Sequence, residues 1–222
     1  MSQLLVPYYE HPTVRPAEWA AIVAAAPRLY AVVLNPASGP GEAPDPAFAE
    51  VAAQLRAVGG TPSGGVRLLG YTDTDYGRRP YADVAEDLTH YRDWYGTDGA
   101  FLDQVAADQK EFRHYQRIAT AAWGTGCATL VLNHGTTPHS SYARIADVLV
   151  TFEGPWTTYR QLPPQSWRGT TGIRFGHLVH GVPTDVDFEA EARARGASVH
   201  CAVPGVGDHP WGTLPHTLEP VQ

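Results

Sequence analysis

Eight short apolar runs, each bounded by Gly, Pro, Asn or Asp, recur along the whole chain and constrain its fold more than any other feature. Several of them, such as AVVLN, TLVLN and VLVTF, are continuous rather than alternating, as in strands covered on both faces. Such strands are typical of a parallel sheet. The runs are Leu4–Tyr8, Tyr30–Asn35, Val66–Tyr71, Gly99–Asp103, Thr129–Asn133, Val148–Glu153, Gly172–Val179 and Ser198–Val203.

Amphipathic segments between the runs predict helices. They are Pro16–Ala26, Pro46–Val58 after an Asp45 N-cap, Tyr81–Tyr95, Glu111–Ala122 and Asp185–Arg195, with only a short segment, Ser140–Ile145, after the fifth run. Eight strand-helix units within 222 residues predict an α/β fold, a compact (β/α)8 TIM-type barrel. An open doubly wound sheet is the alternative, but the loop after the first run lacks the glycine-rich phosphate motif of nucleotide-binding sheets.

The length fits one domain. We expect a single barrel over residues 1–222, in which the Pro- and Gly-rich stretch 204–222 is a C-terminal tail packed on the barrel and anchored by Trp211. Many of the 22 glycines and 19 prolines fall just after predicted strands, where they would stiffen the loops that carry a site. The sequence contains no signal of oligomeric state.

Charge and hydropathy exclude several partner classes. With 16 basic and 23 acidic residues the net charge is −7, which disfavours nucleic acid and anionic membranes. No apolar run approaches the roughly 20 residues that span a bilayer. The first residues lack the basic and apolar regions of a signal peptide, so we expect a cytoplasmic or leaderless protein. Cys127 and Cys201 are expected to be buried small hydrophobes.

Polar side chains close most of the apolar runs, and a barrel brings these ends together on one face. Asp103 ends GAFLD and Glu153 ends VLVTFE, and two such carboxylates facing each other across the mouth meet the requirement for glycoside cleavage. Capping of the following helices is the structural alternative. The other residues at these ends are Tyr8, Asn35, Tyr71, Asp73, Asp75, Gln104, Asn133, His177 and Cys201.

Aromatic residues accompany these ends. Rings stack on the apolar faces of sugars, so we expect a carbohydrate or small glycoside as the partner, although rings also simply fill barrel mouths. They are Tyr8, Tyr9, Tyr71, Tyr76, Trp156 and Tyr159. His177 and His180 lie three apart on one predicted strand and point to opposite faces, so no metal site is expected, and no motif indicates a cofactor.

Seven blocks carry a family resemblance: LLVPYYEHP, VVLNPASGPG, LLGYTDTDYGRRP, GAFLDQ, LVLNHGTTP, LVTFEGPW and HLVHGVP. In these blocks the chain resembles the spherulin-4 family, which is related to spherulation-specific glycoside hydrolases that cleave galactosamine-containing polysaccharide. The resemblance implies a (β/α)8 barrel with a sugar-binding cleft. The family pattern has an Asp-Glu pair after the fourth strand and a Glu after the sixth. Asp103 and Glu153 match, but Gln104 replaces the middle acid.

By analogy with barrel glycosidases whose nucleophile ends the fourth strand and whose acid/base ends the sixth, we expect Asp103 to be the nucleophile or charge stabiliser and Glu153 the general acid/base. Asp73 and Asp75 would add to an acidic cleft that favours a cationic amino sugar. Two alternatives stay open: a carbohydrate-binding or cell-surface barrel silenced by Gln104, and an isomerase or lyase that uses the same carboxylates. The predicted substrate-binding residues are Tyr8, Asn35, Tyr71, Asp73, Asp75, Gln104, Asn133, Trp156 and Tyr159.

Overall fold

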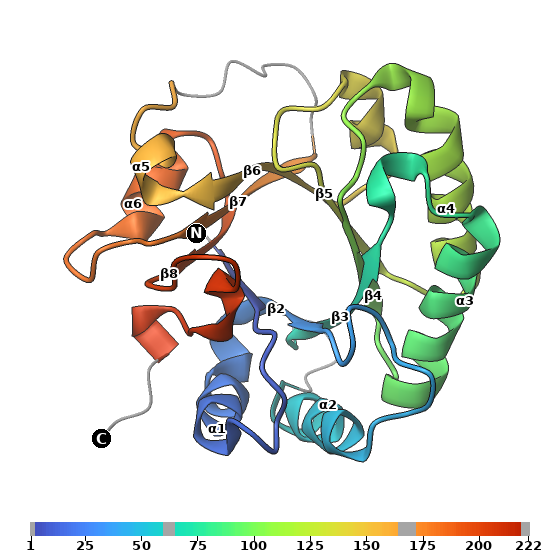
Figure 1. The fold of residues 1–222 in the computed structure, drawn as a ribbon, viewed down its shortest axis with the longest axis horizontal. Coiled ribbons are helices and arrows are strands. Elements are labelled where there is room, and N and C mark those ends of the chain that lie inside the picture. Colours follow the sequence, from blue (N-terminus) through green and yellow to red (C-terminus); the bar gives the residue numbers. More distant parts are fainter. Residues whose placement is uncertain (1–2, 60–64, 164–171, 219–222) are drawn as a thin grey trace.

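A computed structural model describes residues 3–59, 65–163 and 172–218. Eight parallel strands pair in chain order, and β8 pairs with β1, so the sheet closes into a barrel (Figure 1). The predicted (β/α)8 architecture is confirmed and the open sheet is excluded. The strands are β1 (Gln3–Pro7), β2 (Leu29–Leu34), β3 (Arg67–Asp73), β4 (Gly99–Asp103), β5 (Thr129–Asn133), β6 (Val148–Pro155), β7 (Arg174–His180) and β8 (Val199–Val203).

Helices surround the barrel, with α1 and α2, α3 and α4, and α5 and α6 grouped around it in Figure 1. Among the described residues, no helix is long and apolar enough to cross a membrane. The helices are α1 (Pro16–Ala25), α2 (Pro46–Gly59), α3 (Tyr81–His90), α4 (Phe112–Gly124), α5 (Trp156–Tyr159) and α6 (Phe188–Ala194).

The predicted helix boundaries agree closely with the structure, and the exceptions have local causes. Asp45 caps α2 as expected, because its Oδ1 accepts from the backbone N–H of Ala47 at 2.8 Å. The predicted helix over 81–95 divides into α3 and a π-helical turn, Tyr91–Tyr95. The helix predicted over 185–195 begins only at Phe188, because Asp187 caps it. The short segment after β5 is a 3-10 turn, Ser140–Arg144.

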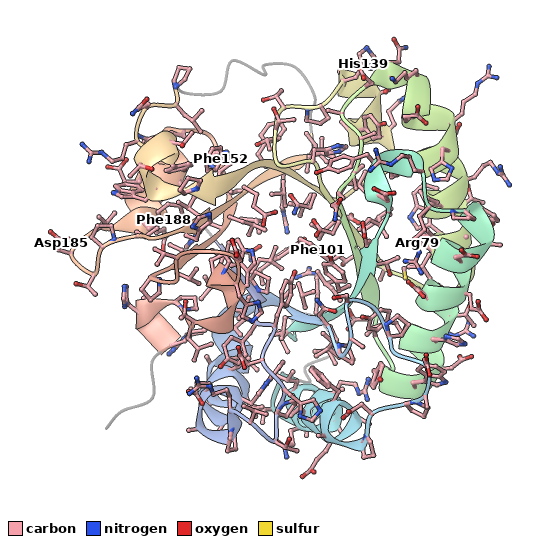
Figure 2. All side chains as sticks on the ribbon, viewed as in Figure 1. Arg79, Phe101, His139, Phe152, Asp185 and Phe188 are labelled. Carbon is pink, nitrogen blue, oxygen red and sulfur yellow. The ribbon has the colours of Figure 1, made fainter. Side chains whose placement is uncertain are left out.

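Alternate strand residues face the barrel interior and the surrounding helices, which explains the continuous apolar runs. Every residue of β2 is buried, and the strand packs in one cluster with Ile22 of α1 and Leu55 of α2. Phe101 lies inside the barrel in Figure 2, whereas Phe152 and Phe188 lie on the side of α5 and α6. The interior is therefore a packed core, and polar side chains collect at its carboxyl end.

After β8 the chain has two short 3-10 turns, Pro210–Gly212 and His216–Leu218. The backbone N–H of Tyr9 donates to the carbonyl of Trp211 at 3.2 Å, which fastens this tail beside the end of β1. Trp211 is buried, with 7% of the residue's surface exposed. The tail thereby brings an aromatic side chain to the carboxyl end of the barrel.

Candidate active site

Asp103, Asn133 and Glu153, from three consecutive strands, meet at the carboxyl end of the barrel. Nδ2 of Asn133 donates to Oδ1 of Asp103 at 2.6 Å and also to Oε2 of Glu153. The amide is oriented by Gly135, whose backbone N–H donates to Oδ1 of Asn133 at 3.1 Å. Because a single nitrogen bonds both carboxylates, the two accepting oxygens lie no more than about 6 Å apart, two hydrogen-bond lengths.

A β-bulge in β6 turns Glu153 toward this group. In the β6–β7 pairing Val150 lies opposite Gly176 and Phe152 opposite His177, so Thr151 is the extra residue. Val148 and Val150 face the barrel interior, whereas Phe152 packs outward against Tyr159. Uninterrupted alternation would send Glu153 outward. The extra residue reverses the phase, and Glu153 faces inward.

The carboxylates border a cavity of about 410 Å³. Gln104 also lines it and has a left-handed backbone, with φ of 49°. The carbonyl of Gln104 accepts a hydrogen bond from the backbone N–H of Tyr76 at 2.7 Å. No lysine or arginine lines this cavity among the described residues. The lining residues are Tyr76, Asp103, Gln104, Asn133, His134, Gly135 and Glu153.

Asp103 is surrounded by hydrogen-bond donors. Burial raises the pKa of its carboxyl above the ordinary value, while the bonds from Tyr71, from the backbone of Gln104 and from Asn133 act in the opposite direction. The phenol of Tyr71 donates to Oδ2 at 2.8 Å. These donors favour the ionised form of Asp103.

Glu153 is the more readily protonated partner. Burial, followed by the charge of Asp103, raises the pKa of Glu153 to about 7. Asn133 and Trp211 oppose this rise by donating to its oxygens, and Nε1 of Trp211 lies 3.0 Å from Oε1. When the pKa values of two neighbouring carboxyls differ in this way, one carboxyl holds the negative charge and the other holds the exchangeable proton. The arrangement suits Asp103 as the anion and Glu153 as the acid.

Three other predicted residues lie at strand ends but make different contacts. Asp73 pairs with Asp103 in register, and its charge adds to the rise in the pKa of Asp103. Oδ1 of Asn35 accepts from the backbone N–H of Gly39 at 3.0 Å, which fixes the loop after β2. Asp75 lies in the turn after β3 and is partly exposed, in an ion pair with Arg78 that lowers the pKa of Asp75.

Three aromatic residues that were predicted to contact substrate lie away from the Asp103–Asn133–Glu153 group, and the structure corrects their placement. They are Tyr8, Trp156 and Tyr159. Tyr8 is buried with its ring 5.6 Å from that of Trp19 on α1. The hydroxyl of Tyr159, fully buried, bonds Nδ1 of His177 at 2.8 Å. Trp156 packs on Tyr159 and Phe188. All three rings belong to the outer layer between strands and helices.

Two further strand-end candidates also lie away from the cavity. His177 is buried on the outer side of β7, and burial lowers its pKa to about 4, so its imidazole is neutral. Cys201 is fully buried in the interior core, as expected for a small hydrophobe. Cys127 is only partly buried.

Tyr9 and Trp211 are site residues that the sequence analysis did not assign to substrate binding. The ring of Tyr9 lies 5.5 Å from that of Tyr71. Burial, with the charges of Asp103 and Glu153, holds the pKa of Tyr9 well above its ordinary value, so it stays protonated. The alternation of side chains along the strand is the signal that could have found Tyr9. Residues separated by an even number of positions point to the same side of a strand, so Tyr9 shares the inward direction of Leu5, whereas Tyr8 points outward.

In the ranges 3–59, 65–163 and 172–218, no group of three or more His, Cys, Asp or Glu side chains is arranged so that it could hold a metal ion. His134 backs the cavity, and its Nδ1 bonds the carbonyl of Ala106 at 3.0 Å. Burial lowers the pKa of His134 to about 4, so its ring is neutral. His177 contacts Tyr159 while the ring of His180 lies 6.3 Å from Trp211, in keeping with opposite faces.

Comparison with known proteins identifies the family. The model of spherulation-specific family 4 matches residues 3–207. The chain belongs to this family. Spherulin-4 of Physarum polycephalum is 33% identical to it over 156 residues, which are 68% of this chain and 44% of the relative. This spherulation-specific family 4 chain therefore spans less than half the length of that curated relative.

Solved structures share the barrel of this family 4 chain. Aspergillus clavatus Sph3, crystallised in complex with GalNAc, superposes with a TM-score of 0.79 at 24% identity, covering 98% of this chain and 94% of that one. The dihydrodipicolinate synthase of Agrobacterium tumefaciens has a TM-score of 0.53 at 14% identity, covering 90% of this chain and 69% of its own. At these identities the likeness shows the fold alone.

Proposed function

We propose that this protein is a glycoside hydrolase that acts on an amino-sugar-containing, galactosamine-type oligo- or polysaccharide. One observation carries the proposal: Asn133 bridges Asp103 and Glu153 at the edge of a cavity. Two carboxyls this close, one with three hydrogen bonds that favour its ionised form and one with a pKa of about 7, are the groups that glycoside cleavage needs. Membership of the family, and the complex of Sph3 with GalNAc, support an amino sugar as the ligand.

The spacing favours a retaining reaction, in which carboxyls lie about 5–5.5 Å apart, over an inverting one, which needs about 6.5–9.5 Å. In the first step Asp103 attacks the anomeric carbon while Glu153 gives its proton to the leaving oxygen. In the second step water attacks the same carbon, Glu153 takes a proton from that water, and the bond to Asp103 breaks. Glu153 ends protonated and Asp103 ionised, as they began.

The charge of the cavity supports the proposed substrate class. Asp73, Asp103 and Glu153 supply carboxyls around the mouth, and the lining described above contains no cationic side chain. A cationic galactosamine residue is favoured there and a neutral N-acetyl sugar is accepted, whereas a uronic acid would meet like charge.

The direct test is the release of reducing ends from a galactosamine-type oligosaccharide. We expect Asp103→Asn and Glu153→Gln each to lower turnover by roughly a thousandfold or more, with folding retained. Glu50→Gln, at an exposed position of α2, is the matched control and keeps wild-type turnover. Retention of the anomeric configuration is checked by the anomeric NMR signal of the first product. Wild-type turnover in Asp103→Asn or Glu153→Gln would refute the assignment.

A saccharide-binding barrel without catalysis is the second candidate, and Gln104 is the observation that favours it. This neutral amide lines the cavity where the family pattern has an acid. Gln104→Glu separates the two candidates. If the Asp103–Glu153 pair is sufficient, activity changes by less than about threefold. If the wild-type protein binds saccharide without hydrolysing it, and only the Gln104→Glu variant hydrolyses it, the second candidate is favoured.

A further inference from the structure

The tail after β8 places one hydrogen-bond donor on the acid of the site. Nε1 of Trp211 lies 3.0 Å from Oε1 of Glu153, while Oε2 accepts from Asn133. An indole nitrogen donates and never accepts, and Asn133 also presents its NH2 group to the carboxylate. Each carboxyl oxygen of Glu153 therefore already accepts one hydrogen bond from an N–H group.

Several contacts hold Trp211 in this place independently of Glu153. Its carbonyl accepts from the backbone N–H of Tyr9, beside β1. The hydroxyl of Thr213 accepts from the backbone N–H of Gly205 at 3.0 Å and donates to the carbonyl of Pro210 at 3.0 Å, which closes the tail into a loop. The indole is thus part of a built structure that approaches the carboxyl group from the end of the barrel wall.

The geometry points to Trp211 as a positioning residue for Glu153: its N–H group fixes the carboxyl rotation so that the exchangeable proton faces the cavity shared with Asp103. This inference rests on the proposed function, because it concerns the acid of that reaction. With both N–H groups in place, a proton on Glu153 has to occupy a lone pair that neither donor fills. If the carboxyl group of Glu153 were free to rotate, its proton would no longer be held toward the cavity.

The surroundings of Glu153 make the contact measurable. Asn133 and Trp211 are its two side-chain donors among the described residues, and both favour the ionised form. Loss of the Trp211 bond would therefore raise the pKa of Glu153 further. The titratable groups that face it are Asp103 from β4, Tyr71 from β3 and Tyr9 after β1, with His180 of β7 against the indole.

Trp211→Phe removes the donor and keeps an aromatic ring. We expect the carboxyl titration of Glu153, followed by ¹³C NMR and assigned by its loss in Glu153→Gln, to move upward by about one pH unit. The alkaline limb of the kcat profile moves with it, and kcat falls about tenfold or more while KM changes little. Trp123→Phe, at a half-exposed site on α4, is the matched control and leaves both unchanged.

A second replacement at position 211 separates the loss of the N–H group from a loss of side-chain packing. A benzothiophene analogue of tryptophan at position 211 keeps the bicyclic shape and lacks the N–H group. The same upward shift in both folded variants supports the inference, and an unchanged Glu153 titration in both overturns it. The NMR titration needs no substrate, so a shifted titration in a protein that hydrolyses no saccharide would support the role of Trp211 and refute the proposed function instead.

Discussion

The phenol of Tyr71 donates a 2.8 Å hydrogen bond to Oδ2 of Asp103 across the pairing of β3 and β4. In register Tyr71 lies opposite Phe101, so its long side chain reaches two residues further along β4 to the carboxylate. Both side chains face inward, and burial with the charge of Asp103 raises the pKa of Tyr71, so the phenol remains a donor. The contact favours the anion that the proposed reaction requires.

Tyr71→Phe tests this contact. Removal of the donor raises the pKa of Asp103, which must be ionised to attack, so we expect the acidic limb of the activity profile to move upward by about one pH unit. The loss of activity is then larger at low pH than at neutral pH. The pH dependence of kcat is the measurement. Tyr81→Phe on α3 is the control, and an acidic limb that stays in place would contradict the prediction.

Asn133→Ala removes the amide that joins the two carboxylates. We expect kcat to fall about a hundredfold, because both carboxyls lose a donor and their relative placement is no longer fixed. Burial, opposed by one donor fewer, then raises the pKa of both carboxyls further. Steady-state kinetics across pH measures the effect, and Thr129→Ser, at the opposite end of β5, serves as control. Unaltered kinetics in Asn133→Ala would show that the bridge is dispensable.

Stability depends on pH through Glu153. Its pKa is raised in the folded protein from an ordinary 4.5 to about 7, so the folded state holds the extra proton between these values. This contribution is fully present below about pH 4.5 and is lost as the pH rises through 7. Urea unfolding should show a slope of up to about −1.4 kcal/mol per pH unit from this group.

Glu153→Gln removes this slope because an amide does not titrate. Its baseline stability also falls, because the new amide must turn its NH2 group toward Asn133 or Trp211, both of which donate. Glu50→Gln should keep the wild-type slope. Identical pH dependence in wild type and Glu153→Gln would contradict the raised pKa.

Tyr159→Phe distinguishes a core role from a substrate role. The hydroxyl bonds His177 inside the outer layer, so its loss should destabilise the fold by about 1 kcal/mol and leave kcat/KM unchanged. Thermal unfolding and saccharide hydrolysis are measured on the same sample. A fall in kcat/KM with unchanged stability would return Tyr159 to the binding site.

The strands and their order followed from the sequence because burial on two faces leaves continuous apolar runs between turn residues. The ends of GAFLD and TLVLN coincide with β4 and β5, which placed Asp103 and Asn133 correctly at the carboxyl end. Strand phase was harder to predict. Tyr8 and Tyr9 are equally aromatic, but only the inward register of Tyr9 brings it near the carboxylates.

The sequence by itself determined the barrel and the strand ends at which Asp103 and Asn133 lie, because local hydropathy and turn chemistry act over a few residues. Tertiary structure decided which side chains meet. The bulge at Thr151 is visible only in the pairing of β6 with β7, and it turns Glu153 from the helix layer to the cavity. Trp211 reaches Glu153 across 58 residues of chain, a contact that only the closed barrel and its folded tail create.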